Sequence, residues 1–156
     1  TVLPLELIAA RRFVLPALGR GVFSPIYIDD LVEGIALAAT RDGAVGQVFT
    51  LAGTAGRGDG GVSCREFFGH YHRMLGRRGP LCLPTALAVA AARLAGGAER
   101  LRGRRTELNA TSMRYLARPG GYSCEKARLV LGFEPRTALD AGMRQTEAWL
   151  RATGRL

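Results

Sequence analysis

The chain has 156 residues, and 47% of them are hydrophobic, so it can bury a core and is not expected to be disordered. Its net charge is +9, but 21 of its 22 basic residues are arginines, most of them scattered along the chain. Only residues 100–105 are densely basic, and aromatic residues are not interleaved with them, so nucleic-acid binding is not expected. No apolar run reaches the roughly 18 residues of a membrane span. Three widely spaced cysteines predict reduced thiols in a cytoplasmic protein.

The first part of the chain predicts a helix, two short strands and a second helix. Residues 4–12 have a proline in their first turn and arginines at their end, which a helix dipole favours. Residues 13–18 form a short apolar run that predicts a strand. Residues 26–28 are β-branched or aromatic and predict a buried strand. A helix over residues 30–40 follows directly, because Asp30 begins a capping box.

The middle of the chain predicts a strand, a loop and a helix. Residues 47–52 are apolar and β-branched enough to predict a strand. Residues 53–61 are rich in glycine and predict a loop. Ser63 and Glu66 then form a second capping box, which opens a helix that ends near Leu75.

The glycines of this loop have the spacing of a dinucleotide-binding fingerprint. Gly56, Gly58 and Gly61 fit G-x-G-x-x-G after a predicted strand and before a predicted helix. The fingerprint also requires an acidic residue about 20 positions later, to bind the ribose. No acidic residue lies between Glu66 and Glu99, so we interpret the segment as a flexible loop.

Two histidines, His70 and His72, lie in the helix that follows. Residues two positions apart on a helix point to opposite sides, whereas zinc ligands on one helix favour a spacing of four. Metal binding is therefore not expected, and we expect both side chains at surface or half-buried positions.

The last third of the chain predicts mainly helices. Residues 84–102 form an alanine-rich helix that Gly96-Gly97 could kink or divide. Its apolar start and the arginines after it leave two alternatives open: packing in a small domain, or contact with an anionic membrane surface. Residues 112–117 predict a short helix or an extended connection. A final helix begins after Thr137, and Trp149 is expected to anchor it.

Two segments resemble a known family. Residues 23–35 read F-S-P-I-Y-I-D-D-L-V-E-G-I and resemble the V-x-V-D-D-L-A segment of extended short-chain dehydrogenases/reductases, the NAD-dependent epimerase/dehydratase superfamily. Residues 122–142 read Y-S-C-E-K-A-R-L-V-L-G-F-E-P-R-T-A-L-D-A-G and are similar to that family's C-terminal Y-S-x-x-K-A-x-x-x-L-G-F-x-P element. The segments follow the family's order, about ninety residues apart. The chain is most similar to 3β-hydroxysteroid dehydrogenase-like and dihydroflavonol reductase-like members.

The second segment contains Tyr122 and Lys126, which have the Y-x-x-x-K spacing of the family's catalytic pair. The catalytic pair belongs in a long helix, but here Ser123 is a predicted N-cap and Gly132 ends the helix after Leu131. The family's C-terminal element accounts for the lysine together with its neighbours. We therefore assign no catalytic residue in this chain.

The resemblance implies an α/β fold: the C-terminal portion of a doubly wound Rossmann-type domain plus a smaller, mainly helical substrate domain. Residues 1–156 would be one fragment, with residues 45–52 giving the last strand of the nucleotide-binding sheet. The parent enzyme would use NAD or NADP, held by motifs upstream of Thr1, to oxidise or reduce a carbon–oxygen centre. The isolated chain is expected to be inactive. A non-catalytic module that binds a ligand or partner is the alternative, and a homodimer is compatible with either.

The resemblance also implies four substrate-binding residues: Phe13, Leu15, Ser24 and Tyr27. Core packing is an equally good explanation for each. Members that use nucleotide sugars commonly carry R-D-[FY] before the predicted strand, where this chain has residues 23–25, F-S-P. A phenyl ring cannot replace a guanidinium that binds phosphate. The expected substrate is therefore weakly charged, such as a sterol-, polyketide- or flavonoid-like compound.

Overall fold

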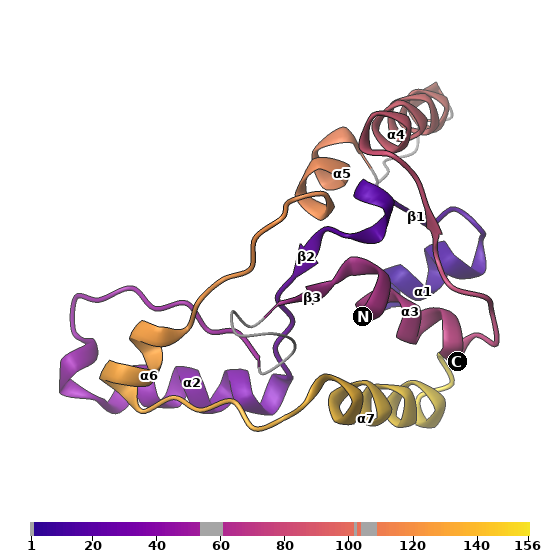
Figure 1. The fold of residues 1–156 in the computed structure, drawn as a ribbon. Coiled ribbons are helices and arrows are strands. Elements are labelled where there is room, and N and C mark those ends of the chain that lie inside the picture. The colour runs from indigo at the N-terminus through magenta and orange to yellow at the C-terminus, as the bar shows by residue number, and fades with distance from the viewer. Residues whose placement is uncertain (1, 54–60, 102, 104–108) are drawn as a thin grey trace. The chain divides into compact units, whose positions relative to one another are not determined.

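The computed structural model describes residues 2–53, 61–101, 103 and 109–156 (Figure 1). The chain forms two compact units, each built from two separate segments. The first unit comprises Thr1–Phe23 and Ser63–Gly120, and the second comprises Ser24–Val62 and Gly121–Leu156. Helices predominate, and the described strands are only two residues long.

The first unit contains most of the elements. In chain order they are α1 (Val2–Ala9), β1 (Val14–Leu15), the 3₁₀-helix η1 (Ala17–Gly19), β2 (Val22–Phe23), α3 (Cys64–Met74), β4 (Leu81–Cys82), α4 (Thr85–Leu101) and α5 (Ala110–Leu116). β1 and β4 are parallel, with Val14 opposite Leu81 and Leu15 opposite Cys82. β2 pairs with β3 (Val62–Ser63) in a second two-stranded sheet.

Helix α3 begins where the sequence predicts. The Ser63 hydroxyl oxygen accepts a hydrogen bond from the Glu66 N–H at 3.1 Å, so the second capping box is confirmed. Leu75 and Gly76 end the helix, and Gly76 has a φ of 64°, which glycine adopts at low cost.

An aromatic cluster forms part of the core of the first unit. Phe13 and Phe68 have ring centroids 4.7 Å apart, and Phe23 and Phe67 have theirs 4.6 Å apart. Tyr71 adds an edge-on contact to Phe67 at 5.7 Å. Tilted and edge-on aromatic pairs of this kind contribute stability beyond the area that they bury. The rings therefore tie β1 and β2 to α3.

Helices α4 and α5 form a smaller core in the same unit. Ala88 and Ala92 of α4 and Met113 of α5 are buried together, and Leu83 and Leu116 pack around them. α4 runs from Thr85 to Leu101 through Gly96-Gly97, so these glycines do not divide the helix. Of the two alternatives for residues 112–117, the helix is confirmed, because α5 spans Ala110–Leu116. No helix within the described ranges has both the length and the apolarity needed to cross a bilayer.

The second unit consists of α2 (Ile28–Thr40), η2 (Asp42–Ala44), α6 (Glu125–Leu131) and α7 (Leu139–Ala152). Its core contains Cys124, Ala127, Leu131 and Phe133 from the region of α6, against which α2, η2 and the 49–51 segment pack. Gly132 has a φ of 70° and ends α6, as predicted.

The start of α2 differs from the prediction. Residues 26–28 do not form a strand; α2 begins at Ile28, with Tyr27 as its N-cap. Asp30 is not the cap. Its buried carboxylate accepts hydrogen bonds from the Arg136 N–H at 3.1 Å and the Thr137 N–H at 3.0 Å. The sequence spacing of a capping box was present, but a long-range contact with two backbone amides occupies the carboxylate.

The predicted strand over residues 47–52 is wrong, because these residues have no regular secondary structure. A parallel strand is stable only when neighbouring strands bond to its backbone, and no described strand pairs with this segment. Val48 is 84% exposed, although its residue type favours a buried strand. Propensity alone therefore does not produce the strand.

The C-terminal helix packs through residues other than its tryptophan. Leu150 and Met143 are buried, whereas Trp149 is 48% exposed and has the Arg155 guanidinium 5.5 Å from its ring centre. The expectation that Trp149 anchors α7 is therefore wrong. The aliphatic face that includes Leu150 anchors the helix instead.

The Asp30 carboxylate gives a first test. The variant Asp30→Ala removes the acceptor of two backbone N–H groups, so the free energy of unfolding should fall by about 2–3 kcal/mol. The exposed neighbour supplies the control: Asp29→Ala should cost no more than about 1 kcal/mol. Urea denaturation measures both, and equal midpoints for the two variants would contradict the role of Asp30.

Candidate functional site

The four predicted substrate residues are divided between the two units. Phe13 and Leu15 belong to the first unit, and Ser24 and Tyr27 belong to the second. Phe13 is 7% exposed and packs against Phe68, whereas Leu15 in β1 has no exposed surface. Phe13 lines the cavity described below, and Leu15 does not line it. Their roles in substrate binding remain predictions.

Ser24 and Tyr27 both make contacts within the second unit. The Ser24 hydroxyl accepts a hydrogen bond from the Tyr122 N–H at 3.2 Å. The Tyr27 ring packs so closely on Gly142 of α7 that a Cβ at this glycine would lie 3.0 Å from it. The small residue at position 142 therefore permits the segment before α2 to contact α7.

The cavity beside Phe13 lies entirely within the first unit and has a volume of about 400 Å³. Its walls come from the end of α1, the start of β1, the end of α3 and the segment leading into β4. The lining residues are Ile8, Arg11, Phe13, Val14, His72, Arg77, Arg78, Gly79 and Leu81. Three of these nine residues are arginines and none is acidic, so the walls favour an anion.

The two histidines of α3 are more buried than the sequence predicted, and His72 is one of the residues that line this cavity. His70 and His72 were expected at surface or half-buried positions, but they are only 9% and 8% exposed. The His70 Nδ1 lies 2.8 Å from an Arg73 guanidinium nitrogen, and the His72 Nδ1 lies 2.7 Å from the Arg78 carbonyl oxygen. The two histidines therefore make hydrogen bonds to different groups. Among the described residues, no three histidine, cysteine, aspartate or glutamate side chains come close enough together to hold a metal ion.

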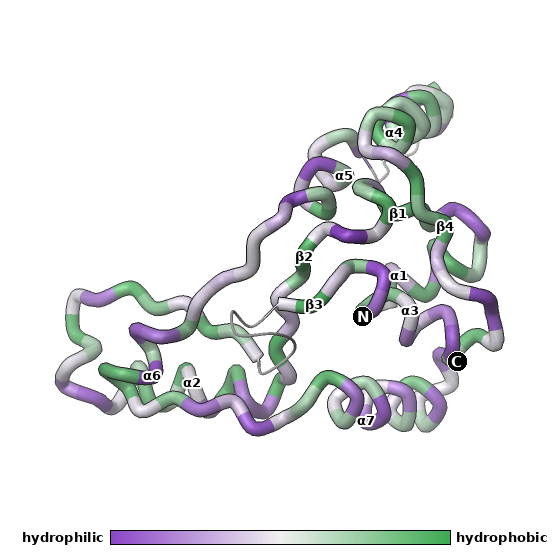
Figure 2. The backbone as a smooth tube through the Cα atoms, in the orientation of Figure 1, coloured by the Kyte–Doolittle hydropathy of each residue, from purple (hydrophilic) through white to green (hydrophobic). Residues whose placement is uncertain are grey.

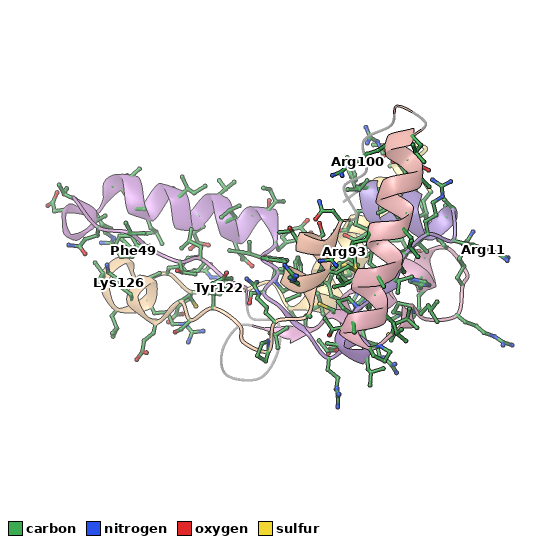
Figure 3. The ribbon with its side chains drawn as sticks, turned by 90° about the horizontal axis from the view of Figure 1, so that it is seen from above. Arg11, Phe49, Arg93, Arg100, Tyr122 and Lys126 are labelled. Atoms are coloured by element: carbon green, nitrogen blue, oxygen red, sulfur yellow. The ribbon has the colours of Figure 1, made fainter. Side chains whose placement is uncertain are left out.

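Tyr122 and Lys126 do not share a helix. α6 begins at Glu125, after Tyr122, so the spacing of four does not place the two groups on one helical face. The Lys126 ammonium donates to the Gln47 side-chain oxygen at 2.9 Å and to the Val48 carbonyl at 3.0 Å. It also lies 5.1 Å from the centre of the Phe49 ring (Figure 3). The lysine thus holds the 47–49 segment, a structural role.

Cys64 is one of three cysteines, all of which are free thiols. Its side chain has no exposed surface, and its sulfur lies 3.5 Å from the Leu116 carbonyl oxygen. Burial raises the pKa of the Cys64 thiol to about 11, although the nearby Arg118 charge acts in the opposite direction. A thiol of this kind is a poor nucleophile near neutral pH, so Cys64 is a structural residue.

The glycine fingerprint lies largely outside the described residues, which omit Gly56 and Gly58. The segment before it is not a strand, so the strand–turn–helix context that a dinucleotide pyrophosphate requires is not present there. The described residues therefore do not fit an NAD site. The densely basic 100–105 run is also only partly described.

No protein-family model matches the sequence, and no curated protein matches it. Several solved structures are similar to this chain, among them the following three. The structure of gox2253 is 22% identical, with a TM-score of 0.63 over 99% of this chain and 44% of its own. UDP-glucose 4-epimerase from Thermotoga maritima with UDP-glucose is 20% identical, with a TM-score of 0.60 over 97% of this chain and 38% of its own. UDP-glucuronic acid 4-epimerase from Bacillus cereus with UDP-glucuronic acid and NAD is 12% identical, with a TM-score of 0.57 over 96% and 38%.

These similarities establish the fold. The chain folds like part of the epimerases and spans less than half the length of the solved structures that it matches. At identities of 12% to 22%, this similarity shows the fold alone.

The thiols give a second test. At pH 9 and under native conditions, Cys64 should react with iodoacetamide more slowly than the half-exposed Cys82, because its burial both hides the sulfur and raises its pKa to about 11. Mass spectrometry of tryptic peptides gives the two rates. Unfolding in urea supplies the control, since both thiols should then react at similar rates. Equal native rates would show that Cys64 is not protected.

Proposed function

We propose that this chain is the C-terminal, substrate-binding part of an NAD(P)-dependent enzyme of the epimerase/dehydratase type. The observation that carries the proposal is the fold similarity, which covers nearly all of this chain but less than half of each similar structure. Two short sequence segments, at residues 23–35 and 122–142, support it independently. The enzyme would oxidise or reduce a carbon–oxygen centre.

Within this proposal the chain's own residues bind and position the substrate. The described residues do not fit a dinucleotide, so the cofactor and the groups that exchange protons with the substrate would belong to the rest of the enzyme. The first unit corresponds to the small substrate domain, with Phe13 and Leu15 near its sheet. Ser24 and Tyr27 would contribute from the second unit, which corresponds to the last part of a doubly wound domain.

The environment of Phe23 supports a weakly charged substrate. It occupies the position at which nucleotide-sugar enzymes of the family carry a phosphate-binding arginine. Its ring packs 4.6 Å from Phe67 and 5.9 Å from Phe68, so it belongs to an aromatic cluster. An apolar wall at this position favours a sterol-, polyketide- or flavonoid-like compound over a nucleotide sugar. A member of the 3β-hydroxysteroid dehydrogenase-like branch would have such a substrate.

An exposed apolar stripe on α2 also supports the proposal. Ile28, Val32 and Ile35 are 59%, 56% and 55% exposed, and hydrophobic residues recur along this helix (Figure 2). Their spacing places them on one helical face. A helix of a doubly wound domain packs such a face against the sheet, and residues 47–52 would then find the strand partners that they lack.

The same stripe favours a second candidate function. A non-catalytic module could use this face to bind a partner, including a second copy of the chain. The two candidates differ in the expected state of the isolated chain. A monodisperse monomer that melts cooperatively would favour the module, whereas aggregation would favour part of an enzyme.

Activity gives a third test. The purified 156-residue chain should neither quench nor shift NADH fluorescence nor oxidise NADH or NADPH with any carbonyl compound, because its described residues do not fit a dinucleotide. The control is the product of the longest open reading frame that contains this chain, which should bind NADH. Turnover by the chain alone would refute the assignment, as would a longer product that lacks dinucleotide binding.

The stripe gives a fourth test. Val32→Lys places a charge at its centre and should reduce self-association of the isolated chain, measured by light scattering. Ala152→Lys adds the same charge at an exposed position of α7 and serves as the matched control. If both variants lower association equally, net charge and not the stripe controls it.

A further inference from the structure

Helix α4 has a row of exposed leucines along one side. Leu87, Leu94 and Leu101 follow one another at intervals of seven residues and are 58%, 77% and 92% exposed. Seven residues make nearly two helical turns, so the three side chains lie almost in line along the helix. Ala91 and Ala98, also exposed, lie beside the row. This side of α4 is therefore apolar over the length of the helix.

The opposite side of α4 packs within the first unit. Ala88 and Ala92 are buried against Met113 of α5, so the helix meets its own unit through small side chains. A helix on the surface of a domain normally directs its large apolar residues inward and its polar residues outward. In α4 the leucines point outward instead, and hydrophobic residues occur along the whole helix (Figure 2). An exposed apolar face of this length indicates an interaction surface.

Arginines border the leucine row at one edge. Arg93 and Arg100 are exposed, and each immediately precedes one of the leucines, so a turn of about 100° separates it from the row (Figure 3). The long arginine side chain can lay its stem along apolar surface and keep its charge at the edge. Glu99 is the only acidic residue of α4, and its carboxylate lies 3.4 Å from the Arg12 guanidinium. The exposed side of α4 thus combines apolar and positively charged groups.

We propose that α4 lies on an anionic membrane surface, with its leucine row at the boundary between headgroups and acyl chains. A helix binds in this way when it buries an apolar face and its cationic residues reach anionic headgroups, which Arg93 and Arg100 would do here. A second copy of the chain is a poorer partner, because it would bring the same arginines to the contact and each chain already has a net charge of +9. The surface does not depend on the proposed enzyme function, since none of the four predicted substrate residues belongs to α4.

Sedimentation with vesicles tests the proposal directly. The full chain is mixed with vesicles of phosphatidylcholine alone, or with vesicles in which about one-third of the lipid is phosphatidylglycerol. It should sediment with the anionic vesicles, should bind the neutral ones much more weakly, and should be released in part at high salt. No binding to anionic vesicles, or equal binding to both kinds, overturns the proposal.

A pair of leucine variants separates α4 from exposed apolar residues in general. Leu94→Gln should weaken binding to the anionic vesicles by about tenfold or more, because it removes an apolar side chain from the centre of the row. Leu129→Gln is the matched control: this leucine of α6 is 80% exposed, against 77% for Leu94. Equal losses in the two variants would contradict a specific role for α4.

Arginine variants test the charged edge in the same assay. Arg93→Gln and Arg100→Gln should each weaken binding about fivefold, because each removes a cation from beside the anionic headgroups. Arg20→Gln removes the same charge from an exposed position outside α4 and should have little effect. The same loss in all three variants would show that net charge alone attracts the chain to the vesicles.

A fluorescent residue shows which part of the chain meets the lipid. The double variant Leu94→Trp/Trp149→Phe has its single tryptophan on α4, and its emission should shift to shorter wavelength when anionic vesicles are added. Unchanged emission while the chain binds would place the contact elsewhere. The longest open reading frame that contains this chain supplies the last comparison: if its product does not bind the vesicles, the rest of that protein covers α4 and the proposal fails.

Discussion

The carboxylate of Asp30 is the contact on which the second unit depends. This unit combines residues 24–62 with residues 121–156, so its two segments are separated by the whole second half of the first unit. Asp30 joins them by accepting hydrogen bonds from the backbone of Arg136 and Thr137, which are 106 and 107 positions away in the chain. Bringing such distant segments together costs chain entropy. The two hydrogen bonds to the buried Asp30 carboxylate offset part of that cost. The position of α7 beside Tyr27 follows from this connection.

Features that depend on neighbours in sequence could be predicted from the chain alone. The cap of α3 requires only Ser63 and Glu66, and the end of α6 requires only a glycine that can adopt a positive φ. Features that depend on distant partners were predicted incorrectly. Residues 47–52 have the composition of a strand, but a strand also requires a neighbouring backbone. Asp30 has the spacing of a cap, but two distant amides compete successfully for its oxygens.

The same distinction applies to the cavity. Phe13 could be singled out only through the family resemblance, which implied a substrate-lining region at this part of the chain. His72, Arg77 and Arg78 could not, since nothing in a single sequence indicates that the end of α3 will lie beside the end of α1. That arrangement results from the parallel pairing of β1 with β4, which brings positions 14 and 81 opposite each other. The only local sequence feature near these residues is the Arg77-Arg78 pair that follows the predicted end of the helix at Gly76. Such a pair by itself is typical of an exposed turn.

Two observations on the second unit have one common explanation. The apolar stripe of α2 is exposed, and residues 47–52 have strand composition without strand structure. A single parallel sheet placed against this unit would correct both, because it would cover the stripe and bond to the backbone of the segment. Lys126 already holds that segment through Gln47 and Val48, so the backbone is positioned before such a sheet joins it. In the first unit Phe13, Phe23 and the aromatic residues of α3 pack against one another, but Leu87, Leu94 and Leu101 of α4 are 58%, 77% and 92% exposed. In the proposed enzyme, the rest of the chain would supply the strands that this segment and the α2 stripe require.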